Sequence, residues 1–423
     1  MKRILKWFLI LLLTAILFLG TLVLFTLVPF NIELKKDGFE LDHRISRVPS
    51  PYDSNGSDWG HNQTKLASLN NLIFTFNYDN SNLANGNSSD QNPYTCEFVY
   101  IKDDIEHIID SKPCNRPGNV LTDTVNNKVY YILSEPTGPA YDSSGEDFTN
   151  FATTKMYEYS YAPSTDLLTL IEEHSVTPST SDGKIRQGVA IDPFGNIVIA
   201  YGSYDGYMNI YTFDLEIRAW DYLSFLSNDT NDSLMYASVA MKDLDHIYIL
   251  AEQDTSNDDG VFYQYVKFFA IEDGNITGTI IADYRYHELA DKYEKMVRNA
   301  DIEIYNGEVH MIAVASKFFE VTYYVYSDNT FTIQDASYMN KDIKNAKFFI
   351  QDHELYITSM SLKFGALIPT FNIYDVANQT KIYTLSSTIL NNYFYIASTE
   401  TELYLLLYSR SKGSLYYIKT NAS

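Results

Sequence analysis

Several nitrogen-bearing side chains recur at similar places in the chain, each a few residues before a short hydrophobic segment. Aligned on the turn that follows, Arg186, Arg298, Lys344 and Asn391 fall near one column, and Lys65 and Arg116 lie close to it. Converging guanidinium and ammonium groups suit a carboxylate, sulfate or phosphate, because arginine offers a planar fork of two donors. The pattern predicts an anion pocket, unless these side chains pair with acidic residues of neighbouring loops.

A candidate helix ends beside this column. The segment from His287 to Val297 has helical spacing, with Leu289, Tyr293 and Met296 on one side. It could narrow the opening of the pocket, which makes His287 a further candidate for ligand binding. Equally, it could be a short packing helix without a ligand role.

Other chemical motifs are missing from the sequence. It has no G-x-S-x-G elbow, no phosphate-binding glycine loop and no His-x-x-x-His pair, and its 8 histidines are scattered. We therefore predict no catalytic residue, no metal and no cofactor. The formal charge of −23 argues against nucleic acid as a partner, because phosphates require a basic surface.

The segments that carry the candidate residues belong to a repeat. In its clearest copy, Gly188–Asp192 is followed by the turn 193–196 and by the strands Ile197–Tyr201, Tyr207–Phe213 and Trp220–Phe225. A unit of four strands with a period of about 45–65 residues is typical of a β-propeller. We expect an all-β fold, a seven-bladed propeller over residues 64–423, with the candidate residues around the mouth of its central channel.

The innermost strands would line this channel. They are expected at Thr64–Leu69, Val120–Thr124, Gly188–Asp192, Tyr236–Met241, Asn299–Ile304, Ala346–Ile350 and Tyr393–Ala397. The seventh copy stops after Leu415–Lys419, one strand short, and an open ring would leave an unpaired edge. The alternating segment Phe39–Ile45 is predicted to pair there and close the ring; the alternative is a flexible stalk.

One face of the ring is predicted to be electrically divided. Long acidic loops between the second and third strands belong to the first four blades, and short basic loops belong to the last three. The acidic residues are Asp79, Asp90, Glu135, Asp142, Glu146, Asp147, Asp205, Asp254, Asp258 and Asp259, and the basic ones are Lys317, Lys363, Arg410 and Lys412. Such a surface could orient a charged partner, although long loops also collect Asp and Asn simply for solubility.

The N-terminus has the pattern of a membrane anchor. Lys2, Arg3 and Lys6 precede residues 7–28, which carry no charge and would span roughly 33 Å as a helix. The basic flank predicts a single-pass protein of the cell membrane, with residues 1–6 in the cytoplasm, 29–63 next to the membrane and the propeller outside the cell. A long signal peptide, cleaved at a site that the pattern does not reveal, is the alternative.

The chain has 2 cysteines, Cys96 and Cys114, both on the predicted extracellular side. A disulfide between them would remove about 3 kcal/mol of unfolded-chain entropy. Two free thiols are the alternative.

The whole repeat region, about 65–420, resembles the β-propeller superfamily. Within it, the segment Ile191-Asp192-Pro193-Phe194-Gly195-Asn196-Ile197 looks loosely like the inner hairpins of sialidase-type repeats. That family implies S-x-D-x-G-x-T-W turns, which this chain lacks. Arg116, Arg186 and Arg298 could imitate an arginine triad around an acidic sugar, but no Tyr–Glu nucleophile pair accompanies them.

Three functions remain open from the sequence. The leading hypothesis is a membrane-anchored extracellular module that binds a protein or a glycan. The second is a carbohydrate-active enzyme, sialidase- or lyase-like, that acts on acidic sugars at the channel mouth. The third is a structural ectodomain of a larger membrane complex. The fold alone does not separate them, because propellers carry many unrelated activities.

Overall fold

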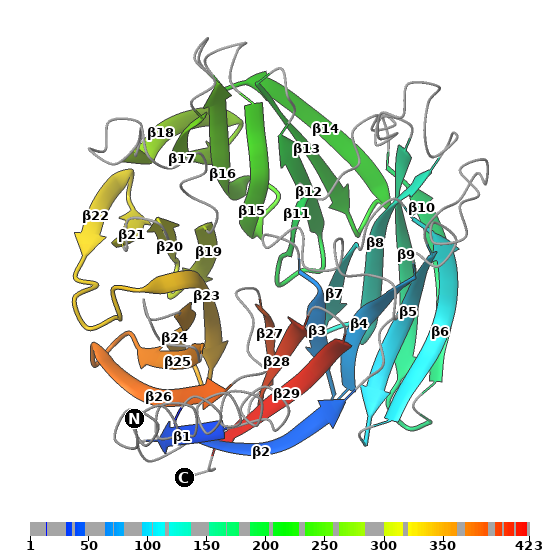
Figure 1. Cartoon of the computed structure of the whole chain (residues 1–423). Helices are drawn as coiled ribbons and strands as arrows, with labels where there is room; N and C mark the ends of the chain where they lie inside the picture. Colours follow the sequence, from blue (N-terminus) through cyan, green and yellow to red (C-terminus); the bar gives the residue numbers. More distant parts are fainter. Residues whose placement is uncertain are drawn as a thin grey trace, which may run out of the picture.

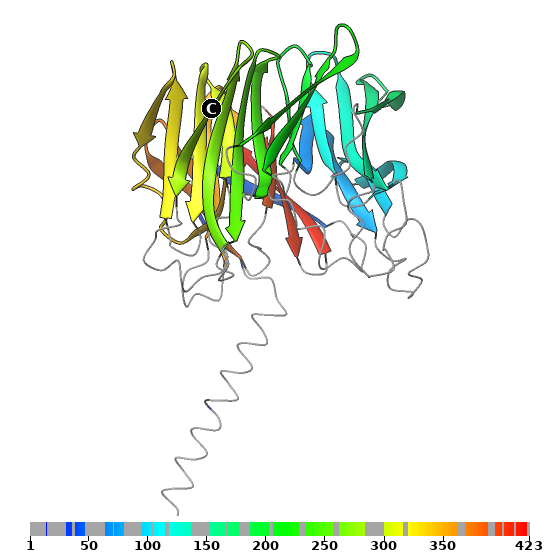
Figure 2. The same ribbon diagram turned by 90° about the horizontal axis from the view of Figure 1, so that it is seen from above.

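The computed structural model shows a β-propeller, a ring of antiparallel sheets around a central channel (Figure 1). It describes residues 14, 31–35, 39–46, 64–70, 72–79, 95–103, 105–114, 118–136, 152–165, 167–176, 187–202, 206–227, 233–256, 262–283, 300–315, 320–361, 369–387, 394–399, 402–409 and 412–420. Seen from the side, the sheets stand next to one another as the wall of a short cylinder (Figure 2). The predicted all-β propeller is confirmed.

Six sheets are built from consecutive strands, and we number them blades 1 to 6. Blade 1 has β3 (Leu66–Leu69), β4 (Leu72–Asp79), β5 (Thr95–Lys102) and β6 (Ile105–Pro113). Blade 2 has β7 (Asn119–Asp123), β8 (Lys128–Pro136), β9 (Ala152–Ala162) and β10 (Leu167–Ser175). Blade 3 has β11 (Gly188–Ile191), β12 (Ile197–Gly202), β13 (Tyr207–Asp214) and β14 (Ala219–Leu226).

The other three follow the same order from the channel outward. Blade 4 has β15 (Ser233–Asp243), β16 (His246–Ser256), β17 (Phe262–Glu272) and β18 (Asn275–Asp283). Blade 5 has β19 (Ala300–Tyr305), β20 (Glu308–Ala315), β21 (Glu320–Ser327) and β22 (Thr330–Gln334). Blade 6 has β23 (Ile343–Gln351), β24 (Glu354–Ser361), β25 (Thr370–Asp375) and β26 (Thr380–Ser387).

The remaining sheet is composite, because it joins the two ends of the chain. Its strands are β27 (Phe394–Ser398), β28 (Glu402–Ser409), β29 (Lys412–Thr420) and β2 (Phe39–Ser46). β2 runs antiparallel to β29, with Phe39 opposite Thr420 and Ser46 opposite Ser414. This is the pairing that the alternating pattern of residues 39–45 predicted.

A second N-terminal strand was not predicted. β1 (Asn31–Lys35) pairs with β26 and makes blade 6 five-stranded, with Asn31 opposite Ser387. The N-terminal segment therefore covers the outer edges of two neighbouring sheets (Figure 1). Residues 31–35 were expected in the segment next to the membrane; they do alternate between polar and apolar, but the run is only five residues long and lies close to the apolar stretch 7–28.

The predicted blade count requires a correction. Among the described strands, blades made of four consecutive strands number six, not seven. The place between blades 6 and 1 is taken by the composite sheet, in which a strand from the start of the chain completes three strands from its end.

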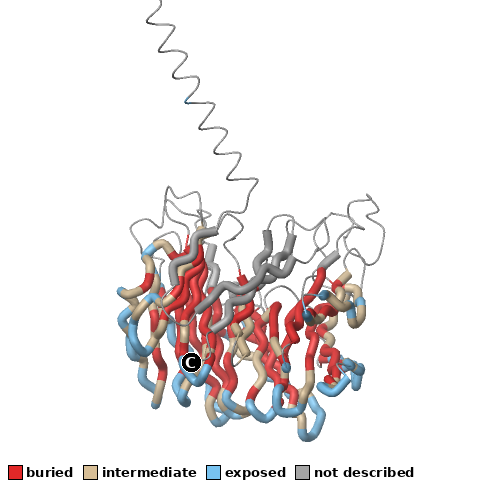
Figure 3. Tube along the Cα trace, turned by 90° about the horizontal axis from the view of Figure 1, so that it is seen from below, coloured by how far each residue is buried: buried red, intermediate tan, exposed pale blue. Residues whose placement is uncertain are grey.

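Burial follows from the way the sheets pack face to face. The second strands are buried on both faces, as in β12, where every residue is buried. The fourth strands are the most exposed; in β14 no residue is fully buried. Figure 3 shows the buried residues running through the sheets and the exposed ones gathered at turns on one face. The second strand of a blade is therefore a nearly continuous hydrophobic run, whereas the fourth strand also carries polar residues.

A hydrophobic cluster lies at each junction between neighbouring described sheets. Blades 5 and 6, for example, share a cluster that includes Ile312, Tyr323 and Phe348. The junction that closes the ring joins Leu66 of blade 1 to Tyr395 of the composite sheet. The core is thus a circle of interfaces rather than a single centre.

Hydrogen bonds from hydroxyl side chains also link neighbouring sheets near the inner turns. Ser398 Oγ donates to the Ile350 carbonyl at 3.0 Å, Ser68 Oγ donates to the Ser398 carbonyl at 2.8 Å, and Thr122 Oγ1 donates to the Ser68 carbonyl at 2.9 Å. These bonds link blade 6, the composite sheet, blade 1 and blade 2 in order around the ring.

The two cysteines form the predicted disulfide. Cys96 lies in β5 and Cys114 follows β6, and their Cα atoms are 5.9 Å apart. Both residues are fully buried in the cluster between blades 1 and 2. The bridge ties the two outer strands of blade 1 together.

Several predictions fall outside the described residues. Of the predicted membrane segment 7–28, only Thr14 is described, and the candidate helix 287–297 is not described. Among the residues that the structure does describe, no helix has the length and hydrophobicity needed to cross a membrane. The anchor and the extracellular location therefore stay predictions.

The junction between blades 3 and 4 generates a first test. A Cβ atom at Gly188 would lie 2.1 Å from the carbonyl oxygen of Ala237 in β15, a backbone atom that cannot turn away. We expect Gly188→Ala to lower the free energy of unfolding by about 1–3 kcal/mol, the usual cost of overpacking. Gly278→Ala is the control, because its Cβ would meet only side chains at 3.2 Å. Equal thermal midpoints for the two variants would contradict this packing.

Candidate functional site

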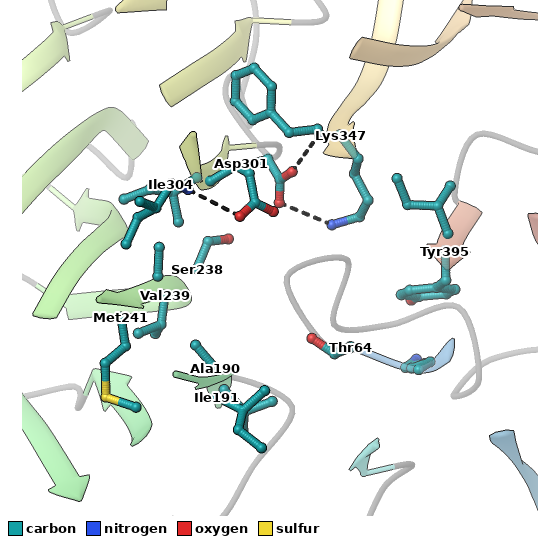
Figure 4. A pocket seen from close by; sticks show the side chains of 17 residues that line it. Thr64, Ala190, Ile191, Ser238, Val239, Met241, Asp301, Ile304, Lys347 and Tyr395 are labelled. Atoms are coloured by element: carbon teal, nitrogen blue, oxygen red, sulfur yellow. Dashed lines mark hydrogen bonds and ion pairs between the residues drawn. The ribbon is translucent and has the colours of Figure 1, made fainter. Parts of the chain in front are cut away.

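The channel at the centre of the ring contains a cavity of about 290 Å³ (Figure 4). Its walls come from the innermost strands of most sheets and from the residues before β3. The lining comprises Thr64, Lys65, Val189, Ala190, Ile191, Ser238, Val239, Ala240, Met241, Asp301, Ile302, Glu303, Ile304, Lys347, Phe348, Tyr395 and Ile396. Most of these side chains are apolar, so the few charged groups determine what the cavity could bind.

An ion pair between blades 5 and 6 forms one wall of the cavity. Lys347 Nζ in β23 lies 3.4 Å from Asp301 Oδ1 in β19, and the Phe348 backbone N–H donates to Asp301 Oδ2 at 2.8 Å (Figure 4). Lys347 is only 9% exposed. Burial raises the pKa of Asp301, whereas the Lys347 charge and the Phe348 N–H lower it. The two charges compensate each other at the channel wall.

Glu303 lies two residues further along β19, on the same face as Asp301 because side chains alternate along a strand. Its carboxylate accepts a hydrogen bond from the Ile304 N–H at 3.0 Å. Burial, and secondarily the negative charge of Asp301, raise the pKa of Glu303 to about 7. This carboxyl group therefore changes its protonation near neutral pH, a property concentrated at functional sites.

A second buried lysine lies across the channel. Lys65 is fully buried, and its Nζ stands 4.9 Å from the centre of the Tyr395 ring in β27. A lysine over a tyrosine face is held by a cation–π interaction. With Glu303 protonated, the described charges of the cavity are Lys65, Lys347 and Asp301, a net charge of +1.

The predicted ring of basic residues can be followed at two positions, Lys65, which lines the cavity, and Lys344. Lys344 lies half-buried in β23, beside an irregularity of the ladder between Ile343 and Asn345. Lys344 is not among the residues that line the cavity, whereas Lys347, three residues further along the same strand, is. Arg116, Arg186, Arg298, Asn391 and His287 lie outside the described residues, so the predicted anion pocket at the mouth stays a prediction.

Three charged residues of the channel, Asp301, Glu303 and Lys347, were not predicted from the sequence. The segment Ala300-Asp301-Ile302-Glu303-Ile304 places two acids at alternate positions of an inner strand, which is unusual for a buried element. That alternation was a usable signal. The partner of Asp301 could not be found in the same way, because Lys347 comes from the next blade.

The divided face is described only in small part. Glu135 in β8 accepts a hydrogen bond from the Tyr157 hydroxyl, and burial raises its pKa. For Asp79, Asp254 and Lys412 the backbone is described, within β4, β16 and β29. The other residues of the predicted acidic and basic loops lie outside the described ranges.

A second charged cluster joins blades 2 and 3. Glu158, Glu172 and His174 bring three potential metal-ligand atoms within 4.8 Å of one another. The guanidinium of Arg218 already contacts all three, at 2.6 Å to each carboxylate and 3.3 Å to His174 Nε2. Lys128 lies 2.8 Å from Glu158, which is fully buried. Hydrogen bonds from these partners outweigh burial and hold the pKa of Glu158 well below its usual range, so we interpret the cluster as an electrostatic clamp between blades.

Removing the arginine tests this clamp. We expect Arg218→Ala to lower the free energy of unfolding by about 2 kcal/mol, because a buried carboxylate loses one of its two cationic partners. Arg218→Lys, which keeps the charge, should lose less. Chemical denaturation at neutral pH measures both variants, and an unchanged stability of Arg218→Ala would show that the clamp is not a stabilising contact.

The pKa of Glu303 predicts a dependence of stability on pH. The folded value of about 7 exceeds the ordinary 4.5, so the folded state retains a proton that the unfolded state releases. The stability that this group contributes is complete below about pH 4.5 and is lost as the pH rises toward 7. Above pH 7, Glu303→Gln should therefore be more stable than the unaltered protein by about 1–3 kcal/mol.

Thermal unfolding of both proteins between pH 4 and 8 measures this difference. Glu216→Gln, in the exposed turn between β13 and β14, is the control and should follow the unaltered protein throughout. If the difference between Glu303→Gln and the unaltered protein stayed constant with pH, Glu303 would have an ordinary pKa.

Comparison with known proteins adds information on the fold. No family model matches the sequence, and no curated protein matches it significantly. Among solved structures, the polysaccharide lyase Uly1 superposes with a TM-score of 0.50 and 10% identity, over 92% of this chain and 99% of that one. A sialidase of Trypanosoma rangeli, in complex with the inhibitor DANA, superposes with a TM-score of 0.41 and 11% identity, over 85% of this chain and 59% of that one. At such identities the likeness shows the fold alone, and the second superposition carries no argument.

Proposed function

We propose that this chain is a binding module, a β-propeller that holds an acidic group of a glycan or a protein in its central channel. The observation that supports this proposal is the charge balance of the cavity, whose lining includes two buried lysines, Asp301 and a carboxyl group with a pKa of about 7. A protonated Glu303 can donate a hydrogen bond to an incoming carboxylate or sulfate, and Lys65 and Lys347 supply attraction.

In this proposal the mouth of the channel also attracts anions. The basic residues predicted there include Arg116, Arg186 and Arg298. The composite sheet counts as the seventh blade, and residues 7–28 anchor the module in the cell membrane with its ring outside. The divided face would meet a protein or glycan partner, since complementary charge orients an approaching molecule.

A carbohydrate-active enzyme is the second candidate. The specific observation in its favour is Glu303, because a group with a pKa near the working pH is suited to donate and accept protons. The likeness to the fold of a polysaccharide lyase along nearly the whole of both chains is compatible with this activity. In that case the substrate would be an acidic polysaccharide, and Glu303 would be the residue that transfers the proton.

Binding of acidic oligosaccharides at different pH values tests the proposal. We expect a uronic-acid oligosaccharide to bind about tenfold more tightly at pH 6 than at pH 8, because ionised Glu303 cancels the net positive charge of the cavity. In Glu303→Gln the affinity should vary little with pH, whereas Glu216→Gln should behave as the unaltered protein does. Isothermal titration calorimetry measures these affinities.

The same samples separate binding from catalysis. Release of new reducing ends by the unaltered protein, abolished in Glu303→Gln, would favour the enzyme. Binding without turnover would favour the module, and replacing both Arg186 and Arg298 by alanine should then weaken it further. Absence of both binding and turnover across acidic glycans would contradict the proposed ligand class.

A further inference from the structure

A second cavity, of about 250 Å³, lies between blades 5 and 6, away from the channel. It is bounded by β20, β21 and β22, by the segment that follows β22, and by the turn between β25 and β26, and it shares no lining residue with the channel cavity. The lining side chains that carry hydrogen-bonding groups include His310, Tyr323, Gln334, Asp335, Tyr338 and Gln379. Amide, phenol, imidazole and carboxylate groups thus meet at one place.

Two polar atoms of residues that line this cavity have no hydrogen-bond partner within the described part of the chain. His310 is only 6% exposed, and its Nδ1 is 2.5 Å from the Tyr323 hydroxyl, but its Nε2 has none. The hydroxyl of Tyr338 is also buried without a partner. Leaving such a group unsatisfied costs about 1–3 kcal/mol, and native proteins rarely do so. Both residues line the cavity, so a water molecule or a ligand hydroxyl inside it can supply the missing partner.

The charge around the cavity excludes an anionic ligand. Its lining includes Glu308 and Asp335 but no lysine or arginine. Hydrogen bonds from the backbone N–H and the hydroxyl of Ser337 lower the pKa of Asp335, which keeps this carboxylate ionised. Burial lowers the pKa of His310, and this effect outweighs the opposing influences of Glu308 and of a hydrogen bond with the Tyr305 backbone, so the imidazole is neutral at neutral pH. An acidic sugar, the proposed ligand of the channel, would be repelled here.

We propose that the cavity between blades 5 and 6 binds one neutral sugar unit through its hydroxyl groups. Hydroxyls both donate and accept, so they suit a neutral imidazole, a phenol, two amides and a carboxylate together. The cavity is smaller than the usual pocket for a drug-sized ligand, which fits a single ring. This site is independent of the proposed channel site, since its ligand is uncharged and its residues are different.

The experiment uses methyl glycosides of neutral hexoses and saturation-transfer NMR on the whole chain. We expect binding to the unaltered protein and a dissociation constant about fivefold larger in Tyr338→Phe, the loss of one hydrogen bond between neutral groups. The variant should fold normally, because the hydroxyl it loses has no partner in the free protein. Tyr130→Phe is the matched control; its hydroxyl is likewise buried and unpartnered, but it lies in blade 2.

A second variant, His310→Phe, removes the imidazole while keeping a ring in the wall, and it should also weaken hexose binding. If hexose bound equally well to both variants and to the unaltered protein, the assignment to this cavity would be wrong. If the unaltered protein bound no hexose, the proposed site would be wrong.

Choline is tested in parallel, because tyrosine rings and carboxylates could instead hold an organic cation. Binding of choline without hexose would contradict the proposed sugar. A failure of the uronic-acid oligosaccharide to bind in the channel would not affect hexose binding in this cavity. The two proposals can therefore fail separately.

Discussion

The closure of the ring is the constraint on which the rest of the structure depends. A twisted sheet that ends in an open edge exposes unpaired backbone groups, and each blade buries its faces only against its neighbours. Here β2 completes the composite sheet from outside, and β1 continues the same segment onto blade 6. Joining the two ends of the chain in one sheet means that no junction can open without breaking strand pairing or a hydrophobic interface.

Closure also creates the site. Asp301 and Lys347 belong to different blades, as do Lys65 and Tyr395, and each pair meets only when the inner strands stand next to one another around the channel. Removed from water, these charges must compensate one another or shift their pKa values. Asp301 is partly compensated by Lys347, although burial still raises its pKa. Glu303 follows the second course, because burial and the negative charge of Asp301 both raise its pKa.

The outer interfaces show the same balance between packing and polarity. Between blades 2 and 3, the buried Glu158 is satisfied by Lys128, His174 and Arg218. Between blades 5 and 6, by contrast, His310 and Tyr338 keep polar atoms without partners beside a cavity. Cations that compensate a buried carboxylate stabilise the ring, whereas a polar atom beside a cavity can form a hydrogen bond with a ligand.

The sequence predicted the repeat and its consequences well, because strand patterns and turns are local. The segment Gly188–Phe225 shows four strands in order, and the missing strand of the last copy indicated that residues 39–45 must return to it. The spacing of Cys96 and Cys114 was compatible with the disulfide that forms. β1 was missed because five residues carry too little pattern to distinguish a strand from a connection.

The sequence by itself determined the propeller, the closing strand and the presence of charged residues near the inner strands. Only the tertiary structure decided which charges meet. The column of basic residues was aligned by position in the repeat, yet the described channel is lined by Lys65, Asp301, Glu303 and Lys347, of which only Lys65 was near that column. The reason is geometric: a charge becomes part of a site through neighbours on other blades, and those neighbours are separated by dozens of residues along the chain.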